Sequence, residues 1–205
     1  MIKYPNGKVV LTKQHSPEKK QRSSASKQGI DFAKRGMSLE QELNLANQYY
    51  LARGLAVIHK KPTPINIVHV HYPKRSAAVI KEAYFQTPST TDYNGVYQGA
   101  YLDFEAKETR LKTAFPLTNF HNHQIQHMEH VITQAGICFV IVRFTSLERT
   151  FVLDAKVVID FWQNQKKDGR KSIPLNCFET KGFEVKASGY PTLDYLPTIH
   201  KIYFS

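Results

Sequence analysis

The chain has 205 residues, of which 41% are hydrophobic, and its 28 Lys and Arg outnumber its 17 Asp and Glu to give a formal net charge of +11. This length suits one α/β domain with a substantial core and is short for two. It contains no run of about 18 apolar residues and no apolar signal segment, so we expect no membrane insertion and no secretion, and a cytoplasmic location.

Residues 1–36 form the most basic segment, with nine Lys or Arg against Glu18 and Asp31. They have almost no apolar periodicity, which predicts a flexible basic arm. Such an arm could contact nucleic acid, because each phosphate that a cation neutralises releases counterions. The alternative is a solvated tail with no role.

The first predicted helix begins beyond this arm. Ser38 and Gln41 have the spacing of a capping box, the apolar stripe continues through Tyr50, and Gly54 can end the helix. Strands are predicted at 55–59 and 65–71, separated by Pro62 and Pro64.

The rest of the chain alternates between strand and helix patterns. A short helix is expected before a hairpin over 92–107, followed by a helix over 117–135, strands at 137–144 and 151–153, and a helix over 157–165. This order favours an α/β fold with a mixed central sheet flanked by helices, in a single domain over 37–205.

The most informative segment runs from Asp92 to Lys107. Side chains alternate along a strand, so Asp103, Glu105 and Lys107 share one face. The turn signals Asn94-Gly95 and Gln98-Gly99 can bring Asp92 back beside Glu105.

Two adjacent carboxylates repel each other, which favours a divalent cation between them. Magnesium suits such a site, because it takes hard oxygen ligands and completes its shell with water and phosphate oxygens. Lys107 could position the attacking water or offset charge at the phosphorus atom.

The motif alone is weak evidence, since an acid two residues before Lys occurs five times in this chain. The copy ending at Lys107 differs from the others in its alternating strand, its preceding turn and its nearby acid. The alternative interpretation is a set of surface charges on an exposed strand.

Several runs resemble the bacterial RecU Holliday-junction resolvases: Arg35-Gly-Met-Ser-Leu-Glu40, His59-Lys-Lys-Pro-Thr-Pro, the segment 72–85, Thr90-Thr-Asp-Tyr-Asn-Gly95 and Asp103-Phe-Glu-Ala-Lys-Glu-Thr109. The likeness covers nearly the whole chain. It implies the restriction-endonuclease-like fold of the PD-(D/E)xK nucleases, although Thr91 replaces the proline that usually precedes the first acid.

The resemblance implies a magnesium site, with manganese as an alternative ion, formed by Thr90, Asp92, Glu105 and Gln124. Lys107 is then the transition-state stabiliser. Asp103 is a less secure candidate, because a solvent-accessible position at a strand end would explain it equally well.

Glu40 is a further catalytic candidate. An acid in the first turn of a helix is ordinarily favourable for the helix dipole. The resemblance also suggests the helix-borne acid that resolvases of this superfamily place near the metal.

Residues 60–89 are the candidate stalk insertion that the resemblance implies, projecting from the nuclease core toward the junction centre. Ala77, Ala78, Val79 and Ile80 would then pack within the stalk. The alternative is an ordinary basic surface hairpin and helix. The candidate DNA-binding residues in this segment are Lys60, Lys61, Lys74, Arg75 and Lys81.

Histidines and cysteines suggest no second site. His123 and His127 have the i, i+4 spacing of zinc helices, but the pattern lacks a third ligand and a catalytic Glu, so a polar helix face explains them better. Cys138 and Cys177 lack metal-ligand spacing and are expected to be reduced and structural.

The resemblance therefore predicts an endonuclease that cuts four-way DNA junctions symmetrically by magnesium-dependent hydrolysis, in recombination and repair at the nucleoid. It implies a homodimer, which matches the two-fold symmetry of a junction. Candidate partners are the RecA-type recombinase and the branch-migration machinery. The alternatives are a non-catalytic DNA-binding or strand-annealing recombination modulator on a nuclease-like scaffold, and an endonuclease that reads a duplex sequence.

Overall fold

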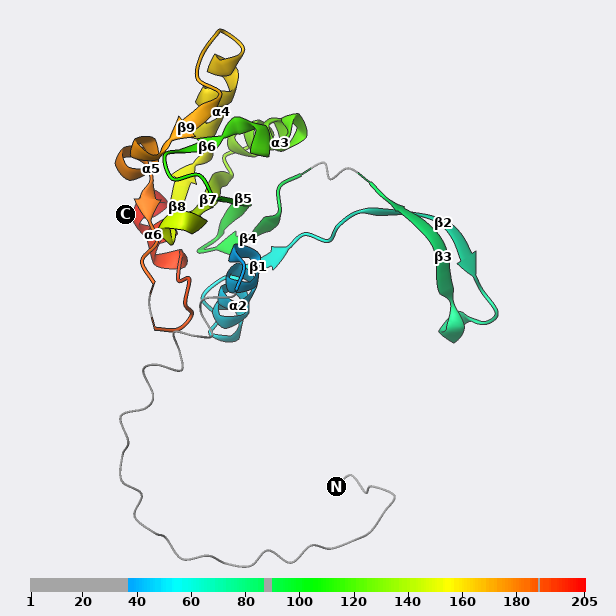
Figure 1. The fold of residues 1–205 in the computed structure, drawn as a ribbon. Coiled ribbons are helices and arrows are strands. Elements are labelled where there is room, and N and C mark those ends of the chain that lie inside the picture. The colour runs from blue at the N-terminus through cyan, green and yellow to red at the C-terminus, as the bar shows by residue number, and fades with distance from the viewer. Residues whose placement is uncertain (1–36, 87–89, 188) are drawn as a thin grey trace, which may run out of the picture. The chain divides into compact units, whose positions relative to one another are not determined.

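A six-stranded mixed sheet forms the centre of the fold, with the strand order β1-β4-β5-β7-β8-β10 (Figure 1). The computed structural model describes residues 37–86, 90–187 and 189–205. Residues 37–205 group into one compact unit. The predicted basic arm over 1–36 lies outside the described residues. The strands of the main sheet are β1 (Val57–Lys60), β4 (Tyr93–Tyr97), β5 (Ala100–Thr109), β7 (Ile137–Phe144), β8 (Arg149–Asp154) and β10 (Phe183–Glu184).

Strands β5 and β7 pair in parallel, and the other neighbours in this sheet pair antiparallel. The parallel pair requires a crossover, which the chain supplies through helix α3 (Asn122–Thr133). Strand β7 is buried along most of its length, as its continuous apolar sequence predicted. The predicted mixed α/β sheet is confirmed.

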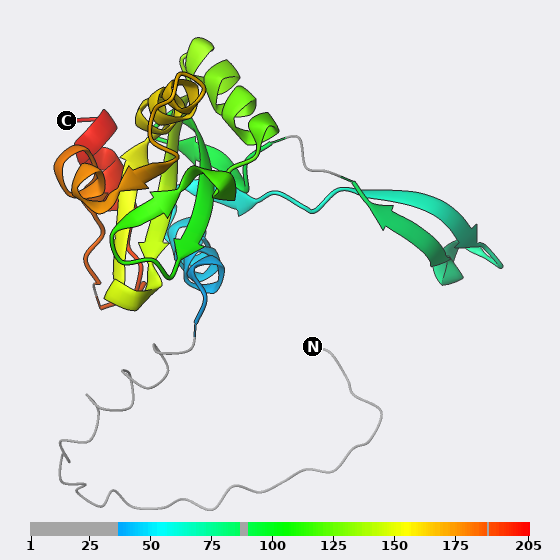
Figure 2. The ribbon, with the colours of Figure 1, turned by 45° about the horizontal axis from the view of Figure 1, so that its top comes forward.

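Each face of the sheet has its own core. Alternate residues of β7 separate between the two, since Phe139 and Ile141 belong to one cluster and Val140 and Val142 to the other. Helices α2 (Leu39–Ala52) and α6 (Leu196–Tyr203) contribute to the first core. Helices α3, α4 (Ala155–Gln165) and α5 (Leu175–Lys181) contribute to the second (Figure 2).

The shorter elements complete the unit. Strands β6 (Ala114–Pro116) and β9 (Ser172–Pro174) form a separate antiparallel pair. Single 3-10 turns occupy Leu117–Asn119 and Thr145–Leu147. The helix expected over 117–135 therefore begins later, at Asn122, after one such turn. None of the helices in the described part of the chain is long and apolar enough to cross a bilayer.

The predicted capping box of α2 is present. The Ser38 hydroxyl accepts from the Gln41 backbone N–H at 3.3 Å, and the Gln41 side chain accepts from the Ser38 N–H at 2.9 Å. Gly54 follows the helix with a φ of 64°, the left-handed conformation that glycine adopts most readily.

One of the two predicted turn signals is wrong. Asn94-Gly95 lies inside β4, and the chain reverses at Gln98-Gly99, where both residues have positive φ. Gly95 is needed for a different reason, because a Cβ there would lie 2.1 Å from the Val57 carbonyl oxygen of β1. The glycine permits a close approach of neighbouring strands.

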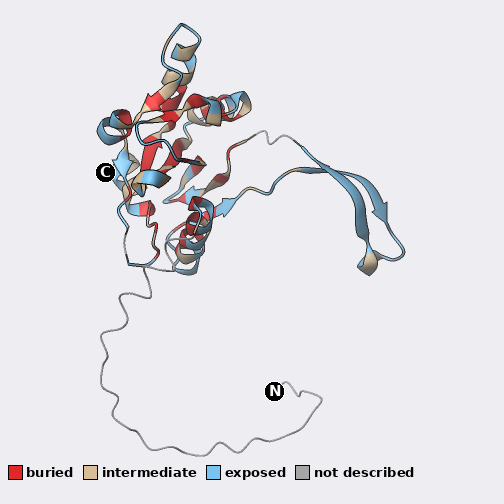
Figure 3. Cartoon of the chain, in the orientation of Figure 1, coloured by how far each residue is buried: buried red, intermediate tan, exposed pale blue. Residues whose placement is uncertain are grey.

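The short helix expected before Asp92 is also wrong. A 3-10 turn over Arg75–Ala77 is followed by strand β3 (Val79–Phe85), which pairs antiparallel with β2 (Ile65–His71). Branched and aromatic residues favour the extended conformation in β3. Every residue of both strands is exposed (Figure 3), including Val79 and Ile80, which were expected to pack within the stalk. This two-stranded pair is called the β2–β3 hairpin below.

Candidate active site

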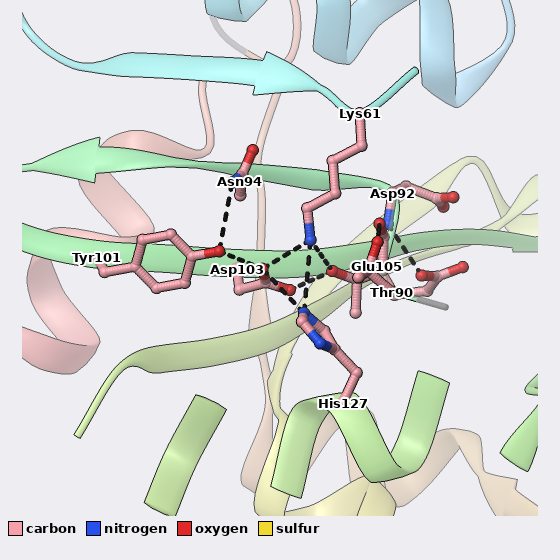
Figure 4. A network of polar contacts seen from close by, with 9 residues as sticks. Lys61, Thr90, Asp92, Asn94, Tyr101, Asp103, Glu105 and His127 are labelled. Carbon is pink, nitrogen blue, oxygen red and sulfur yellow. Dashed lines mark hydrogen bonds and ion pairs between the residues drawn. The ribbon is translucent and has the colours of Figure 1, made fainter. Parts of the chain in front are cut away.

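The β4–β5 hairpin brings the two predicted carboxylates together. Tyr93 pairs with Phe104, so Asp92, directly before β4, lies beside Glu105 of β5. The Asp92 backbone N–H donates to Glu105 Oε2 at 3.1 Å (Figure 4). Asp92 Oδ2 accepts from the Ala106 N–H at 3.3 Å. These reciprocal bonds hold both carboxylates at one end of the hairpin.

Glu105 is completely buried. Its Oε1 lies 2.7 Å from Lys107 Nζ and accepts from Gln124 Nε2 at 2.6 Å. Burial, and then the negative charge of Asp92, raise the pKa of Glu105 to about 8 despite the opposing effect of Lys107. Burial therefore favours the protonated form of this carboxyl, and a bound cation would favour its ionised form.

The donor set fits a hard divalent cation. Among the residues that the structure describes, no group of three or more His, Cys, Asp and Glu could hold a metal ion. The site instead offers the two carboxylates of Asp92 and Glu105. The Gln124 side chain contacts Glu105, and Thr90 lies two residues before Asp92. A site with few protein oxygens suits magnesium, which keeps several water ligands and binds substrate phosphate.

Gln124 and Thr90 are already engaged with other groups. The Gln124 amide oxygen accepts from the His121 backbone N–H at 2.9 Å, and its amide nitrogen faces Glu105. Gln124 thus orients Glu105 directly. The Thr90 hydroxyl donates to the Thr91 carbonyl at 3.2 Å.

Glu40 lies in the first turn of α2 and forms an ion pair of 2.6 Å with Lys60. A pocket of about 270 Å³ is lined by Glu40 together with Asp92 and Lys107. The fold therefore brings this helix-borne acid to the same pocket as the strand residues. Lys60, a candidate DNA contact, has its ammonium group next to Glu40 in this state.

Asp103 is not a solvent-accessible strand-end residue, as the alternative explanation of it supposed. It is fully buried, and its Oδ2 lies 2.8 Å from Lys61 Nζ and 3.2 Å from His127 Nε2. The Tyr101 hydroxyl donates to the same oxygen at 2.8 Å, and the Thr91 hydroxyl donates to Oδ1 (Figure 4).

Burial alone would raise the pKa of Asp103, but the hydrogen bonds from Lys61, Thr91 and Tyr101 together lower it below its usual range. Sequence reasoning missed Thr91, Tyr101 and His127 as its partners. Tyr101 could have been found, because it lies two residues before Asp103 on the same strand face. His127 and Thr91 come from other elements and leave no local signal.

The predicted DNA-binding residues fall into two groups. Lys61 is 17% exposed and its ammonium is bound to Asp103, so it does not project freely into solvent. Lys74 and Lys81 are exposed, and Arg75 opens the 3-10 turn of the β2–β3 hairpin. A second pocket, of about 370 Å³, is lined by Lys60, Lys61, Pro62, Thr63, Pro64, Thr90, Thr91 and Asp92.

The remaining histidines and cysteines have ordinary surroundings. The rings of His121 and His123 stack with centroids 5.5 Å apart, while His127 faces Asp103. Cys138 and Cys177 are free and buried, and burial raises the pKa of the Cys138 thiol.

Comparison with known proteins identifies similar chains along the full length. Residues 34–201 match the family model RecU, described as Recombination protein U. The chain is 54% identical over 205 residues to a Holliday junction resolvase RecU of Geobacillus sp. (strain WCH70), covering 100% of this chain and 99% of the relative. It is 56% identical over 201 residues to that of Lactiplantibacillus plantarum, with coverages of 98% and 95%. It is 51% identical over 205 residues to that of Bacillus subtilis (strain 168), with coverages of 100% and 97%.

Proposed function

Because this chain belongs to the RecU family, we propose that it is a structure-selective endonuclease that resolves Holliday junctions in DNA recombination and repair. The observation that carries the proposal is the convergence of Asp92, Glu105 and Lys107 at one end of the β4–β5 hairpin. Paired carboxylates and a cation within one pocket are suited to the hydrolysis of a phosphodiester.

Asp92 and Glu105 are proposed to hold a magnesium ion, for which manganese is an alternative, with Thr90 and Gln124 completing the protein's share of the ligands. The bound ion supplies Lewis-acid chemistry and a more acidic water molecule. Without the ion, the Gln124 amide nitrogen orients the Glu105 carboxylate through its 2.6 Å hydrogen bond. To act as a ligand, Gln124 would turn its amide oxygen from the His121 backbone N–H toward the ion. Lys107 places a positive charge where the attacked phosphate accumulates negative charge.

Glu40 is proposed to act at the rim of the same pocket. In the free protein it forms an ion pair with the partly exposed Lys60. A phosphate that entered the pocket would compete with Glu40 for the Lys60 ammonium, which frees the Glu40 carboxylate beside Asp92 and Lys107.

Substrate selection is proposed to come from the β2–β3 hairpin and from an overall charge of +11. Both strands of this hairpin are fully exposed, and Lys74, Arg75 and Lys81 lie on it or next to its strands. Cations of this kind bind phosphates without reading bases, so junction shape dominates over sequence.

A four-way junction needs two matched cuts, so we propose a homodimer with two-fold symmetry and one site in each subunit. The substrate also implies a cytoplasmic, nucleoid-associated protein. A RecA-type recombinase and the branch-migration machinery act on the same DNA intermediate and are the proposed protein partners.

The test is cleavage of a labelled mobile four-way junction and of matched linear duplexes, with magnesium or with EDTA. Paired symmetric cuts that need magnesium, occur only in the junction and disappear with Asp92→Asn are expected. The matched control is Asp160→Asn, because Asp160 is an exposed acid on α4. Tight junction binding by the wild type without metal-dependent cutting would leave a non-catalytic DNA binder, and site-specific cutting of linear duplex would indicate a restriction-type enzyme.

A further inference from the structure

The Asp103 carboxylate joins the two ends of the segment that connects β1 to β4. Lys61 directly follows β1, and its Nζ lies 2.8 Å from Asp103 Oδ2. Thr91 lies just before β4, and its hydroxyl donates to Asp103 Oδ1 and accepts from Lys61 Nζ at 3.0 Å. The chain therefore leaves and re-enters the main sheet at a single buried carboxylate (Figure 4).

Lys61 and Thr91, at the two ends of this connecting segment, are also linked to the carboxylates of the proposed metal site. The Lys61 backbone N–H donates to the Asp92 carbonyl at 2.8 Å, so this lysine contacts Asp92 through its backbone and Asp103 through its side chain. Asp103 lies two residues before Glu105 on the same strand face. A displacement of Lys61 or Thr91 would thus act on both carboxylates of the proposed metal site.

The contacts of Asp103 distinguish it from a metal ligand. Its two oxygens accept from Lys61, Thr91 and Tyr101, with His127 Nε2 at 3.2 Å. A buried and well-partnered polar network is rigid, because water is not available to replace a missing partner. The partners lie on β5, on α3, directly after β1 and just before β4, so the network ties four places in the chain to one carboxylate.

We propose that Asp103 is a positioning residue that couples the β2–β3 hairpin to the metal-site carboxylates, which makes cleavage respond to the substrate that the hairpin engages. This inference rests on the proposed junction-cutting function. The strands of the hairpin are exposed throughout, so an effect of bound DNA reaches the sheet through the two ends of the segment, and both ends are held by Asp103.

The test uses Asp103→Asn, Lys61→Met and the double variant in the full-length protein. Three quantities are measured: the single-turnover rate of junction cleavage at saturating magnesium, the junction Kd in EDTA, and hydrogen exchange at the Lys61 amide. We expect the cleavage rate to fall roughly 10- to 100-fold, as small misplacements of reacting groups cause. The Kd should stay within about threefold, because the phosphate contacts that dominate affinity remain in place. The Lys61 amide should exchange faster, and the double variant should be no worse than the more impaired single variant.

The matched control is Glu42→Gln. Glu42 forms a 2.7 Å ion pair with Arg143, and both of these side chains are largely shielded from solvent, as are those of Asp103 and Lys61. The pair joins α2 to β7, however, and does not involve the segment that connects β1 to β4. The Glu42→Gln variant should have a lower thermal stability. Its hydrogen exchange at the Lys61 amide and its ratio of cleavage rate to junction affinity should equal those of the wild type.

Wild-type cleavage and exchange in Asp103→Asn would overturn the proposal. So would an unchanged Lys61 amide combined with a more than tenfold higher magnesium requirement, since that result assigns Asp103 to the metal site. If Asp103→Asn does not fold, Thr91→Val removes one hydroxyl of the network and is judged by the same readouts. If the wild type cuts no junction, the proposed function fails, and amide exchange still decides whether Asp103 holds the two chain ends.

Discussion

At the scale of single residues, Glu105 combines complete burial with a raised pKa. A fully buried carboxyl beside the negative charge of Asp92 loses its proton only near pH 8. Lys107 and Gln124 form an ion pair and a hydrogen bond with this side chain. These contacts do not fully offset the unfavourable free energy of burying its negative charge. The protein thus carries a strained electrostatic arrangement that cation binding would relieve.

The raised pKa of Glu105 predicts a pH dependence of stability. The unfolded chain releases this proton near its ordinary pKa of 4.5, and the folded chain releases it near 8. The folded state therefore binds more protons in this window, and the free energy of unfolding falls as pH rises through it, by up to about 1.4 kcal/mol per pH unit. Thermal unfolding in EDTA between pH 5.5 and 8 measures this slope, and Glu105→Gln should remove this contribution. An equal slope in the variant would show that Glu105 titrates normally.

Lys107 provides a second test at the residue scale. Lys107→Ala should lower kcat for junction cleavage by roughly 10²- to 10³-fold, because it removes a positive charge from the proposed transition state. It should also raise the magnesium requirement, since Lys107 lowers the pKa of Glu105 and its loss makes the ionised, metal-binding form harder to reach. Single-turnover cleavage across a magnesium titration separates these effects. Lys156→Ala, at an exposed position on α4, is the control and should cut normally.

At the scale of elements, the β1–β4–β5 pairing determines whether the site forms. Tyr93 and Phe104 stack across β4 and β5 at 4.8 Å, and Phe104 stacks on Phe139 of β7 at the same distance. The aromatic rings therefore hold the register that places Asp92 beside Glu105. On the other side of β4, Gly95 allows β1 to approach, and β1 leads directly to Lys61.

Gly95→Ala tests this arrangement. The new methyl group would meet the Val57 carbonyl oxygen, the Ile58 Cα and the Ile58 side chain, so β1 must move away from β4. We expect a loss of at least about 1–3 kcal/mol in the free energy of unfolding, with weaker cleavage, because two of these contacts are with backbone that cannot rotate aside. Urea denaturation gives the first value. Gly189→Ala has open space around its Cβ and should be neutral.

At the scale of the whole molecule, the two cores lie on the faces of the main sheet, and the β2–β3 hairpin contributes little buried surface to either. A two-stranded hairpin gains little stability by itself in water. Its exposed apolar side chains, among them Ile67, Val68 and Phe85, are therefore available for contact with a partner.

Replacement of residues 65–85 by a short Gly-Ser linker separates folding from substrate selection. Thermal unfolding should shift by less than about 4 °C, because little buried surface is removed. Junction affinity should fall, and the slope of log K against log salt should become less steep by about 0.9 for each phosphate that the hairpin no longer neutralises. Titration at several salt concentrations measures this slope. The double variant Lys74→Ala, Lys81→Ala keeps the β2–β3 hairpin but removes two of its positive charges. Its junction affinity therefore separates the effect of the hairpin's charge from that of its shape. A large decrease in thermal stability would show that the hairpin belongs to the folding core.

Features that depend on neighbouring residues were predicted from the amino-acid sequence alone. Alternation along β5 placed Asp103, Glu105 and Lys107 on one face, the apolar run at Ile137–Phe144 predicted the buried strand, and Ser38 with Gln41 predicted the helix start. These follow from the backbone geometry of one element and from hydrogen bonds over a few residues.

Which elements come into contact could be learned only from the folded chain. Local turn preference gave Asn94-Gly95 and Gln98-Gly99 as turn signals alike, but pairing with β1 keeps Asn94-Gly95 within a strand. From the sequence, a solvent-accessible strand end explained Asp103 equally well, but the fold buries it and brings Lys61, Thr91 and His127 to it from three other places in the chain. The burial of a charge, and therefore its pKa and its partners, depends on packing between segments that are distant in sequence, which no local pattern records.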